Sequence, residues 1–396
     1  MRFLMMLSLG VFLAKLGFSK TYIALFETFL LVMVAGSSFW VNGCFQTLAG
    51  ENFQGKATLR TIFWTMMGYA GVVAMFFYAL HDWIFSFWHV QESANITLWL
   101  SLWFLTYPVS LLLEYAWMIE KKSRLLWMSV FGLQPLIPLF LIGSAYTGNP
   151  EAMVRGFAFL GILRWILLVI YVQPWREKPR WQKGTLPLLL VGILTGYAPH
   201  IDAGLVRRFV PDQLAIFQYG ARELPLSVML MAALSEAMAP FTRVKADLLV
   251  LRERVKKYLW PLFAVSIGLM WMAPFLFQTV FTPDFAPAAG IFQIFLLLLI
   301  PRLWMPQVWF LGTGQRRKIL WAAGVDTFLN VTVSLALFPF LGIQGLAWGT
   351  VVAFSAEKIL LAFWLRKEKI TLDQLIPVNS WAIGSLLLVI SYVFAS

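Results

Sequence analysis

The feature that most constrains this chain is its nearly continuous series of long apolar stretches. A helix that crosses a bilayer needs roughly 20 apolar residues, and about 13 such windows follow one another with little chain between them. The 396 residues are 60% hydrophobic and only 13% charged, whereas soluble domains are about a quarter charged. No room is left for a soluble domain. The sequence therefore predicts an all-α polytopic membrane protein.

The spans divide into two groups of six and one extra. The predicted spans are 3–17, 21–48, 61–80, 96–118, 125–146, 153–172, 186–206, 213–240, 258–281, 287–311, 318–340, 343–365 and 376–394. The segment Pro174–Lys183 (PWREKPRWQK) is polar, basic and proline-containing. We therefore predict an N-terminal six-helix bundle at 1–173, a cytoplasmic linker at 174–184, a C-terminal six-helix bundle at 185–366 and an extra helix at 367–396. Such parallel repeats place a site between the halves, near the midplane.

The basic residues predict the orientation. With a cytoplasmic N-terminus and alternating spans, 22 Lys and Arg lie on the cytoplasmic side and only Lys20, Arg207 and Arg208 on the other. This is the positive-inside asymmetry. The net charge of +12 therefore reflects orientation and contact with anionic membrane lipids, and it is not evidence of a nucleic-acid partner. We expect a multi-pass protein of the bacterial cytoplasmic (inner) membrane.

The N-terminus and the single cysteine limit other interpretations. Met1–Lys15 resembles a signal peptide, but no small-residue cleavage site follows promptly, so we interpret it as a retained first helix. The single cysteine, Cys44, excludes an intramolecular disulfide and a cysteine-based metal cluster. His81, Asp82 and the following outer-loop residues fit no familiar zinc spacing. We expect no metal and no cofactor.

A set of motifs in the second half resembles a known superfamily. Asp202 lies in span seven, Tyr219 lies early in span eight, and Pro240 closes that span. The loop after span ten reads GTGQRRK, and span eleven continues as NVTVSLALFPFLGIQGLA from Asn330. In this order the motifs resemble the multidrug/oligosaccharidyl-lipid/polysaccharide (MOP) flippases, and within them the O-antigen and exopolysaccharide branch. The resemblance implies two six-helix bundles, with 12 or 14 spans where this chain shows 13.

The resemblance implies transport of a lipid-linked oligosaccharide from the cytoplasmic to the outer leaflet. A polyprenyl-pyrophosphate carrier needs cations that keep their charge when desolvated, and the planar guanidinium of arginine suits phosphate oxygens. Arg164, Arg222 and Arg302 lie within spans and are our candidate substrate-binding residues; the alternative for each is a structural ion pair. Other polysaccharide-assembly membrane proteins are expected partners.

An ionisable residue inside a span is a site hypothesis by default. Asp202 and His200 lie two residues apart in span seven, and Glu27 occupies the corresponding outer part of span two. We predict that they form a coupling site for H⁺ or Na⁺, a role that carboxylates play in related drug antiporters. The alternative for the first two is a polar pair near the outer surface.

Two other functions remain open at this stage. A cation-coupled multidrug antiporter of the same fold would favour a cavity with acidic residues and few cations. An integral-membrane enzyme of polysaccharide assembly would present acidic or histidine-bearing outer loops, but the outer loops here are short. No phosphate-binding glycine loop with Lys and Ser/Thr is present, which excludes direct ATP hydrolysis. We therefore expect a transporter and not an enzyme.

Overall fold

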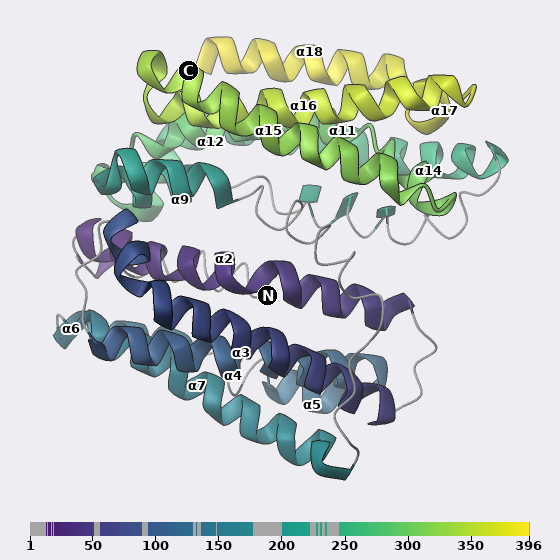
Figure 1. Cartoon of the computed structure of the whole chain (residues 1–396). Helices are drawn as coiled ribbons and strands as arrows, with labels where there is room; N and C mark the ends of the chain where they lie inside the picture. The colour runs from purple at the N-terminus through teal and green to yellow at the C-terminus, as the bar shows by residue number, and fades with distance from the viewer. Residues whose placement is uncertain are drawn as a thin grey trace. The chain divides into compact units, whose positions relative to one another are not determined.

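The protein is described by a computed structural model (Figure 1). It describes residues 13, 15–16, 18, 20–50, 56–88, 94–129, 132, 136–147, 149–176, 200–221, 227–228, 230–231, 234–235 and 245–395. All regular structure in these ranges is helical, and seven of these helices are long and apolar enough to cross a membrane. The prediction of an all-α polytopic membrane protein is confirmed. The first predicted span and large parts of spans seven and eight lie outside the described residues.

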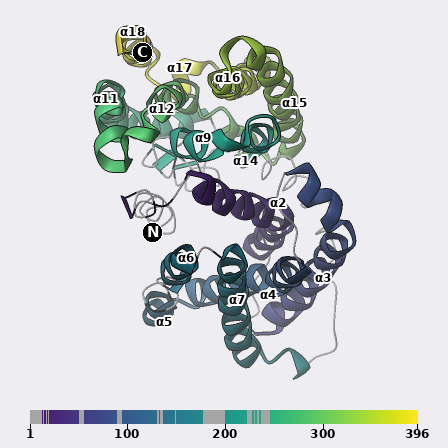
Figure 2. The same ribbon diagram turned by 90° about the vertical axis from the view of Figure 1, so that its left-hand side faces the viewer.

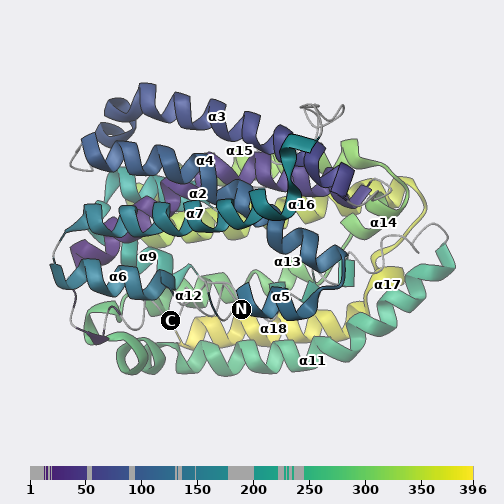
Figure 3. The ribbon, with the colours of Figure 1, turned by 90° about the horizontal axis from the view of Figure 1, so that it is seen from below.

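One compact unit, here the N-terminal unit, comprises residues Gly17–His200 and Arg207–Asp212. Its helices are α2 (Lys20–Gly50), α3 (Lys56–Phe87), α4 (Ala94–Ile119), α5 (Ser123–Met128), α6 (Leu136–Thr147) and α7 (Pro150–Val172), followed by the 3₁₀ turn η2 (Pro174–Arg176). Helix α4 packs against both α3 and α7, as Figure 3 shows from below.

Close approach of these helices depends on glycine. A Cβ atom on Gly161 of α7 would lie 2.8 Å from Oγ1 of Thr106 and 3.1 Å from the backbone nitrogen of Tyr107, both on α4. A Cβ on Gly36 of α2 would lie 2.4 Å from the ring of Phe104. Small residues let membrane helices approach closely, and this packing substitutes for the hydrophobic drive that lipid cannot supply.

The second compact unit, here the C-terminal unit, comprises Met1–Leu16, Ile201–Val206 and Gln213–Ser396. Its helices are α9 (Leu214–Gly220), α11 (Lys245–Leu276), α12 (Ala288–Leu296), α13 (Leu299–Arg302), α14 (Gln307–Gly312), α15 (Arg316–Leu341), α16 (Ile343–Lys367), α17 (Leu372–Leu375) and α18 (Val378–Ala395). Short turns are η3 (Pro211–Gln213), η4 (Phe277–Phe281) and η5 (Pro283–Phe285). Helix 200–209 precedes them. Figure 2 shows α15 beside α16, and Figure 3 shows α18 beside α11.

Helices α15 and α16 form an antiparallel hairpin. The chain reverses at Gly342, whose φ of +58° favours glycine. A Cβ on Gly345 would lie 2.6 Å from the carbonyl oxygen of Leu337, and a Cβ on Gly349 would lie 2.8 Å from the backbone nitrogen of Ser334. These two glycines, four residues apart on one face of α16, bring the two backbones into contact and set the register of the hairpin.

Two predicted spans differ in detail from the structure. Predicted span ten, 287–311, is formed by the three helices α12, α13 and α14, because Pro301 and Pro306 each remove a backbone donor. Predicted span nine, 258–281, is too short at its N-terminal end, since residues from Lys245 onward continue unbroken into the span as α11. Buried leucines and valine recur at helical spacing across the junction, at Leu248, Leu251, Val255 and Leu259.

Large apolar side chains cover the outer faces of the long helices. Phe340 is 84% exposed and Phe394 is 74% exposed, and Phe328 faces outward in the same way. Contiguous exposed apolar surface of this kind is rare on soluble monomers. In a chain with spans of this length, the hydrocarbon of the bilayer covers these faces.

Candidate functional site

Asp202 lies in a buried polar cluster of the C-terminal unit. It is 3% exposed and belongs to helix 200–209. Its Oδ2 accepts hydrogen bonds from Thr350 Oγ1 of α16 and from Asn330 Nδ2 of α15, the latter at 3.5 Å. Its Oδ1 accepts from Ser334 Oγ of α15 at 3.3 Å. Three segments distant in sequence therefore meet at one carboxyl group.

The cluster contains more acceptor atoms than donor hydrogens. Ser334 Oγ lies within hydrogen-bonding distance of three acceptors, namely Asp202 Oδ1, Asn330 Oδ1 at 3.0 Å and the Leu346 carbonyl at 3.3 Å. A hydroxyl group carries one hydrogen, so at most one of the three receives it. Thr350 Oγ1 is likewise near both Asp202 and the Leu346 carbonyl at 3.5 Å. Such an excess of oxygen acceptors is satisfied by a hard cation or by a proton on the carboxyl group.

No lysine or arginine in the described part of the chain forms an ion pair with Asp202. A buried charged group must be paired or bind an ion, because it is costly to desolvate. The described residues thus supply hydrogen bonds to this carboxyl group but no opposite charge.

The other two predicted coupling residues belong to the N-terminal unit, whereas Asp202 belongs to the C-terminal unit. His200 is the first described residue of helix 200–209, and it does not hydrogen-bond to Asp202. Glu27 is 4% exposed on α2 of the N-terminal unit. The predicted coupling role of both residues stays a prediction.

Arg302 lies at the end of α13, in the C-terminal unit with Asp202. Its guanidinium carbon is 4.9 Å from the centroid of the Phe354 ring. The ammonium group of Lys358 is 4.5 Å from the same centroid. Cations are attracted to the face of an aromatic ring, and the attraction increases when the cation is desolvated. One phenylalanine within α16 therefore holds two cations inside a membrane span.

Lys358 also pairs with its neighbour in sequence. Its ammonium group lies 2.9 Å from Glu357, and both residues are buried. The two neighbours in sequence therefore form a buried ion pair. Arg302, Lys358 and Glu357 together carry one net positive charge.

Arg164 occupies the interior of the N-terminal unit. It is 1% exposed on α7, and its Nη2 donates to Glu114 of α4 at 2.7 Å. Glu114 also accepts from Ser129 at 3.0 Å, and the guanidinium carbon lies 5.2 Å from the Tyr107 centroid. Arg164 thus forms the structural ion pair named as its alternative role, and substrate binding by it remains a prediction. Arg222 lies outside the described residues.

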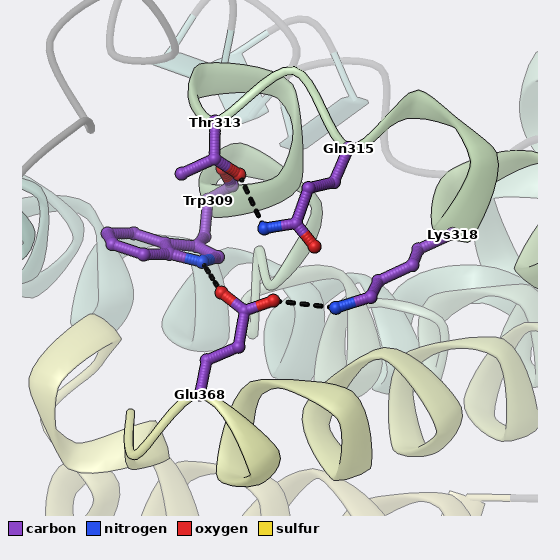
Figure 4. A network of polar contacts seen from close by, with 5 residues as sticks. All are labelled: Trp309, Thr313, Gln315, Lys318 and Glu368. Atoms are coloured by element: carbon purple, nitrogen blue, oxygen red, sulfur yellow. Dashed lines mark hydrogen bonds and ion pairs between the residues drawn. The ribbon is translucent and has the colours of Figure 1, made fainter.

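A second polar network joins the basic ends of α14, α15 and α16 (Figure 4). Glu368 accepts from Lys318 at 2.6 Å and from the indole nitrogen of Trp309. Beside them Gln315 donates to Thr313 at 3.1 Å. Burial acts to raise the pKa of Glu368, but hydrogen bonds from Lys318, Trp309 and Gln315 outweigh it and lower the pKa below its ordinary value of 4.5. The network fixes the loop that carries the predicted GTGQRRK motif.

The N-terminal unit contains an apolar cavity of about 470 Å³. Its walls come from α2, α3 and α4, and no charged residue lines it. Representative lining residues are Val32, Gly36, Phe76, Phe77, Trp83 and Phe104. A cavity of this size accommodates a drug-sized apolar ligand or an alkyl chain.

Sequence reasoning missed three members of these clusters. Ser334, Thr350 and Lys358 were not predicted as site residues. The available signal was the helical spacing of Asp326, Asn330 and Ser334, which places all three on one face of α15.

Comparison with known proteins shows the fold. No family model matches the chain, and no curated protein matches it. Among solved structures, it is similar to one described as "Lipid II flippase MurJ, inward closed conformation", with 15% identity, a TM-score of 0.69 and coverage of 98% of this chain and 90% of that one. It is also similar to an inward-facing multidrug resistance MATE family transporter of the MOP superfamily, with 14% identity, a TM-score of 0.62 and coverage of 91% and 93%. A MATE mutant matches at 15% identity and a TM-score of 0.53, with 92% of each chain covered.

These similarities confirm the predicted all-α membrane fold, because the chain shares the fold of these solved structures over most of its length.

Proposed function

We propose that this chain is a cation-coupled transporter that flips a lipid-linked oligosaccharide from the cytoplasmic to the outer leaflet by alternating access. Its place is the bacterial inner membrane, with the N-terminus in the cytoplasm, beside other polysaccharide-assembly proteins. The similarity to a structure described as a lipid II flippase supports this choice. The O-antigen branch indicated by the sequence motifs is part of the proposal.

The observation that carries the proposal is the pair of cations at Phe354. Arg302 and Lys358 lie within the membrane-spanning part of the C-terminal unit, and both cations lie within 5 Å of the centroid of the same aromatic ring, at 4.9 and 4.5 Å. A cation in a span is costly and is retained where it meets an anion. A pyrophosphate linkage is such an anion, and arginine binds its oxygens in a bidentate manner.

The coupling ion is proposed to bind at Asp202. Six oxygen atoms gather there, from Asp202, Asn330, Ser334, Thr350 and the Leu346 carbonyl. Sodium is a hard cation that oxygen ligands suit, and a proton would neutralise the carboxyl group directly. Both remain candidates, and a carboxamide at position 202 would remove either one.

The proposal is tested in proteoliposomes with a fluorescent polyprenyl-pyrophosphate-linked disaccharide, whose outer-leaflet fraction is measured by dithionite quenching. We expect R302A and R222A to lose translocation, and R302K to retain part of it. R254A is the matched control, because Arg254 is exposed on α11. If R302A and R222A, present in the vesicles in normal amount, translocate like R254A, the proposed phosphate-binding role is wrong.

A multidrug antiporter of the same fold is the second candidate. The apolar cavity in the N-terminal unit favours it, because none of its described lining residues is charged and its volume suits a drug-sized ligand. Filling the cavity with V72W, at a lining position that already carries a side chain, would abolish efflux of a lipophilic cation but leave translocation of the lipid-linked sugar intact if the two activities use different sites. Efflux of the lipophilic cation by the wild type, without flipping of the sugar, would favour the antiporter.

A further inference from the structure

Asp326 is an intramembrane carboxyl group that the functions above do not use. It lies on α15, one helical turn from Asn330 and about two turns from Ser334, on the same face of the helix. It is only partly buried. Within the described part of the chain it accepts no hydrogen bond and forms no ion pair. The described residues therefore provide this carboxyl group with neither a hydrogen-bond donor nor an ion-pair partner.

The register of the hairpin places Asp326 level with a second charged pair. Ser334 of α15 contacts Gly349 of α16. Because the helices are antiparallel, eight residues further toward their basic ends bring Asp326 level with Glu357. That distance is about 12 Å along the helix axis. Asp202 thus lies at one level of the C-terminal unit, and the Glu357–Lys358 pair lies at a second level, nearer the basic ends of α15 and α16. Asp326 lies at this second level, on the same face of α15 as Asn330 and Ser334, which contact Asp202.

Electrostatics connects the two levels. The charged groups that act on Asp326 are Glu357 and Lys358 from α16 and Asp202 from helix 200–209. Arg302 of α13 reaches the same region of α16 through the Phe354 ring that it shares with Lys358. A cation that neutralises Asp326 therefore changes the field at the proposed pyrophosphate-binding cations.

A purely structural role does not account for this arrangement. Glu357 and Lys358 already pair with each other at 2.9 Å, so Asp326 is not needed to neutralise the lysine. A carboxyl group in a span without a protein partner costs stability that an asparagine or serine would not. Such residues are retained in ion and proton pathways.

We propose that Asp326 is a second cation-binding carboxyl group, which exchanges the coupling ion with the Asp202 cluster and passes it to the basic end of α15 and α16. That end is cytoplasmic by the charge distribution. The inference rests on the proposed coupling role of Asp202. If the ion is a proton, an O–H bond breaks at the Asp202 carboxyl group and one forms at the Asp326 carboxylate, through an intervening water. If the ion is sodium, it changes oxygen ligands and no covalent bond changes.

The test separates ion binding from ion movement. Binding is measured as the rise in thermal stability of the purified full-length protein when NaCl replaces choline chloride, repeated over a pH series. Movement is measured in proteoliposomes, as exchange of radioactive sodium or as proton exchange reported by a trapped pH-sensitive dye. The variants are D202N, D326N and the conservative D326E. E253Q is the control, because Glu253 is an exposed carboxylate on α11 of the same unit.

We expect D202N to lose both cation-dependent stabilisation and exchange. D326N should keep the stabilisation and lose the exchange, whereas D326E and E253Q should keep both. Exchange by D326N at the rate of E253Q would overturn the inference. Loss of stabilisation in D326N would overturn it too, since Asp326 would then belong to the Asp202 site. A D202N variant that binds and exchanges the cation normally would instead refute the proposed coupling function, whatever D326N does.

A second measurement does not depend on ion exchange. Cys44 is buried and is the only cysteine, so D326C in a C44A background carries one thiol. A cationic, membrane-impermeant thiol reagent added from the cytoplasmic side should modify it. Absence of modification from that side, with the protein intact by size-exclusion chromatography, would exclude the pathway.

Discussion

The contact between Gly349 and Ser334 allows a sharp test of how the Asp202 cluster is built. In G349A the added Cβ would lie 2.0 Å from Ser334 Oγ, 2.8 Å from its backbone nitrogen and 2.9 Å from its Cα. The hydroxyl group can rotate away, but it then gives up its bonds to Asp202 and Asn330. The backbone atoms cannot rotate away, so α15 and α16 must separate until these contacts reach 3.4 Å, where ordinary van der Waals contact begins.

Two costs follow from this geometry. Overpacking of a close interface costs about 1–3 kcal/mol. Loss of the Ser334 hydrogen bond to a carboxylate adds roughly 1.5–3 kcal/mol. We therefore expect G349A to destabilise the protein by about 2.5–4 kcal/mol, taking the lower half of each range. Since 1.4 kcal/mol is a factor of ten in an equilibrium constant, about 1 kcal/mol of this cost at the ion site would weaken cation binding about fivefold.

The assay is reversible unfolding in mixed micelles with and without sodium. The control is G324A, because a Cβ on Gly324, also on α15, would meet no atom within 4 Å. G324A should be neutral or stabilising by up to about 1 kcal/mol, since alanine is the better helix former. In the double variant S334A/G349A, removal of the hydroxyl group should make the two effects less than additive. A G349A variant as stable as G324A would refute the packing argument.

Three further changes have defined outcomes. E368Q should lower stability by about 1–2 kcal/mol at neutral pH, because hydrogen bonds to a charged group are lost. The pKa of Glu368 in the folded protein is depressed, so the stabilisation that it provides is present above pH 4.5 and is lost as the pH falls through the lowered pKa. The wild type and E368Q should therefore have the same melting temperature in strong acid, and a difference that persists there would contradict this reasoning. R164M should lower the free energy of unfolding by about 3–5 kcal/mol, because the Glu114 carboxylate loses its ion-pair partner. The double variant R164M/E114L should lose less in the same unfolding assay, and equal losses would show that the ion pair is not the cause. R155A should change stability by less than about 1 kcal/mol, because its pair with Glu151 is exposed; a larger loss would mean that the arginine has another role.

The fold could be predicted because the cost of placing unpaired backbone polar groups in hydrocarbon decides which structures are stable. Long apolar runs have no stable alternative to a helix in a bilayer. Predicted span 21–48 is therefore observed as α2 (Lys20–Gly50), and predicted span 343–365 as α16 (Ile343–Lys367). Hydropathy alone could not predict the three pieces of span ten, since the break depends on where Pro301 and Pro306 remove hydrogen bonds.

The site could be predicted only in part. Asp202 and Arg302 were accessible to sequence reasoning, because a charge in an apolar run has few explanations. Ser334 and Thr350 could not be predicted in this way, because serine and threonine are common in spans and their hydroxyl groups usually hydrogen-bond to backbone carbonyls of their own helix. Their contact with Asp202 depends on the register of α15 against α16, which the glycine contacts set and a single sequence does not report.

Glycine packing of α15 on α16 also has a mechanical consequence. Two helices whose backbones touch at Gly345 and Gly349 have little freedom to slide or rotate, so they move as one rigid body. The polar groups of Asn330, Ser334, Leu346 and Thr350 then keep fixed positions relative to one another, whereas Asp202 comes from a separate helix, 200–209. A coupling ion bound there, as proposed, would tie helix 200–209 to the α15–α16 hairpin, so that displacement of this helix would require release of the ion.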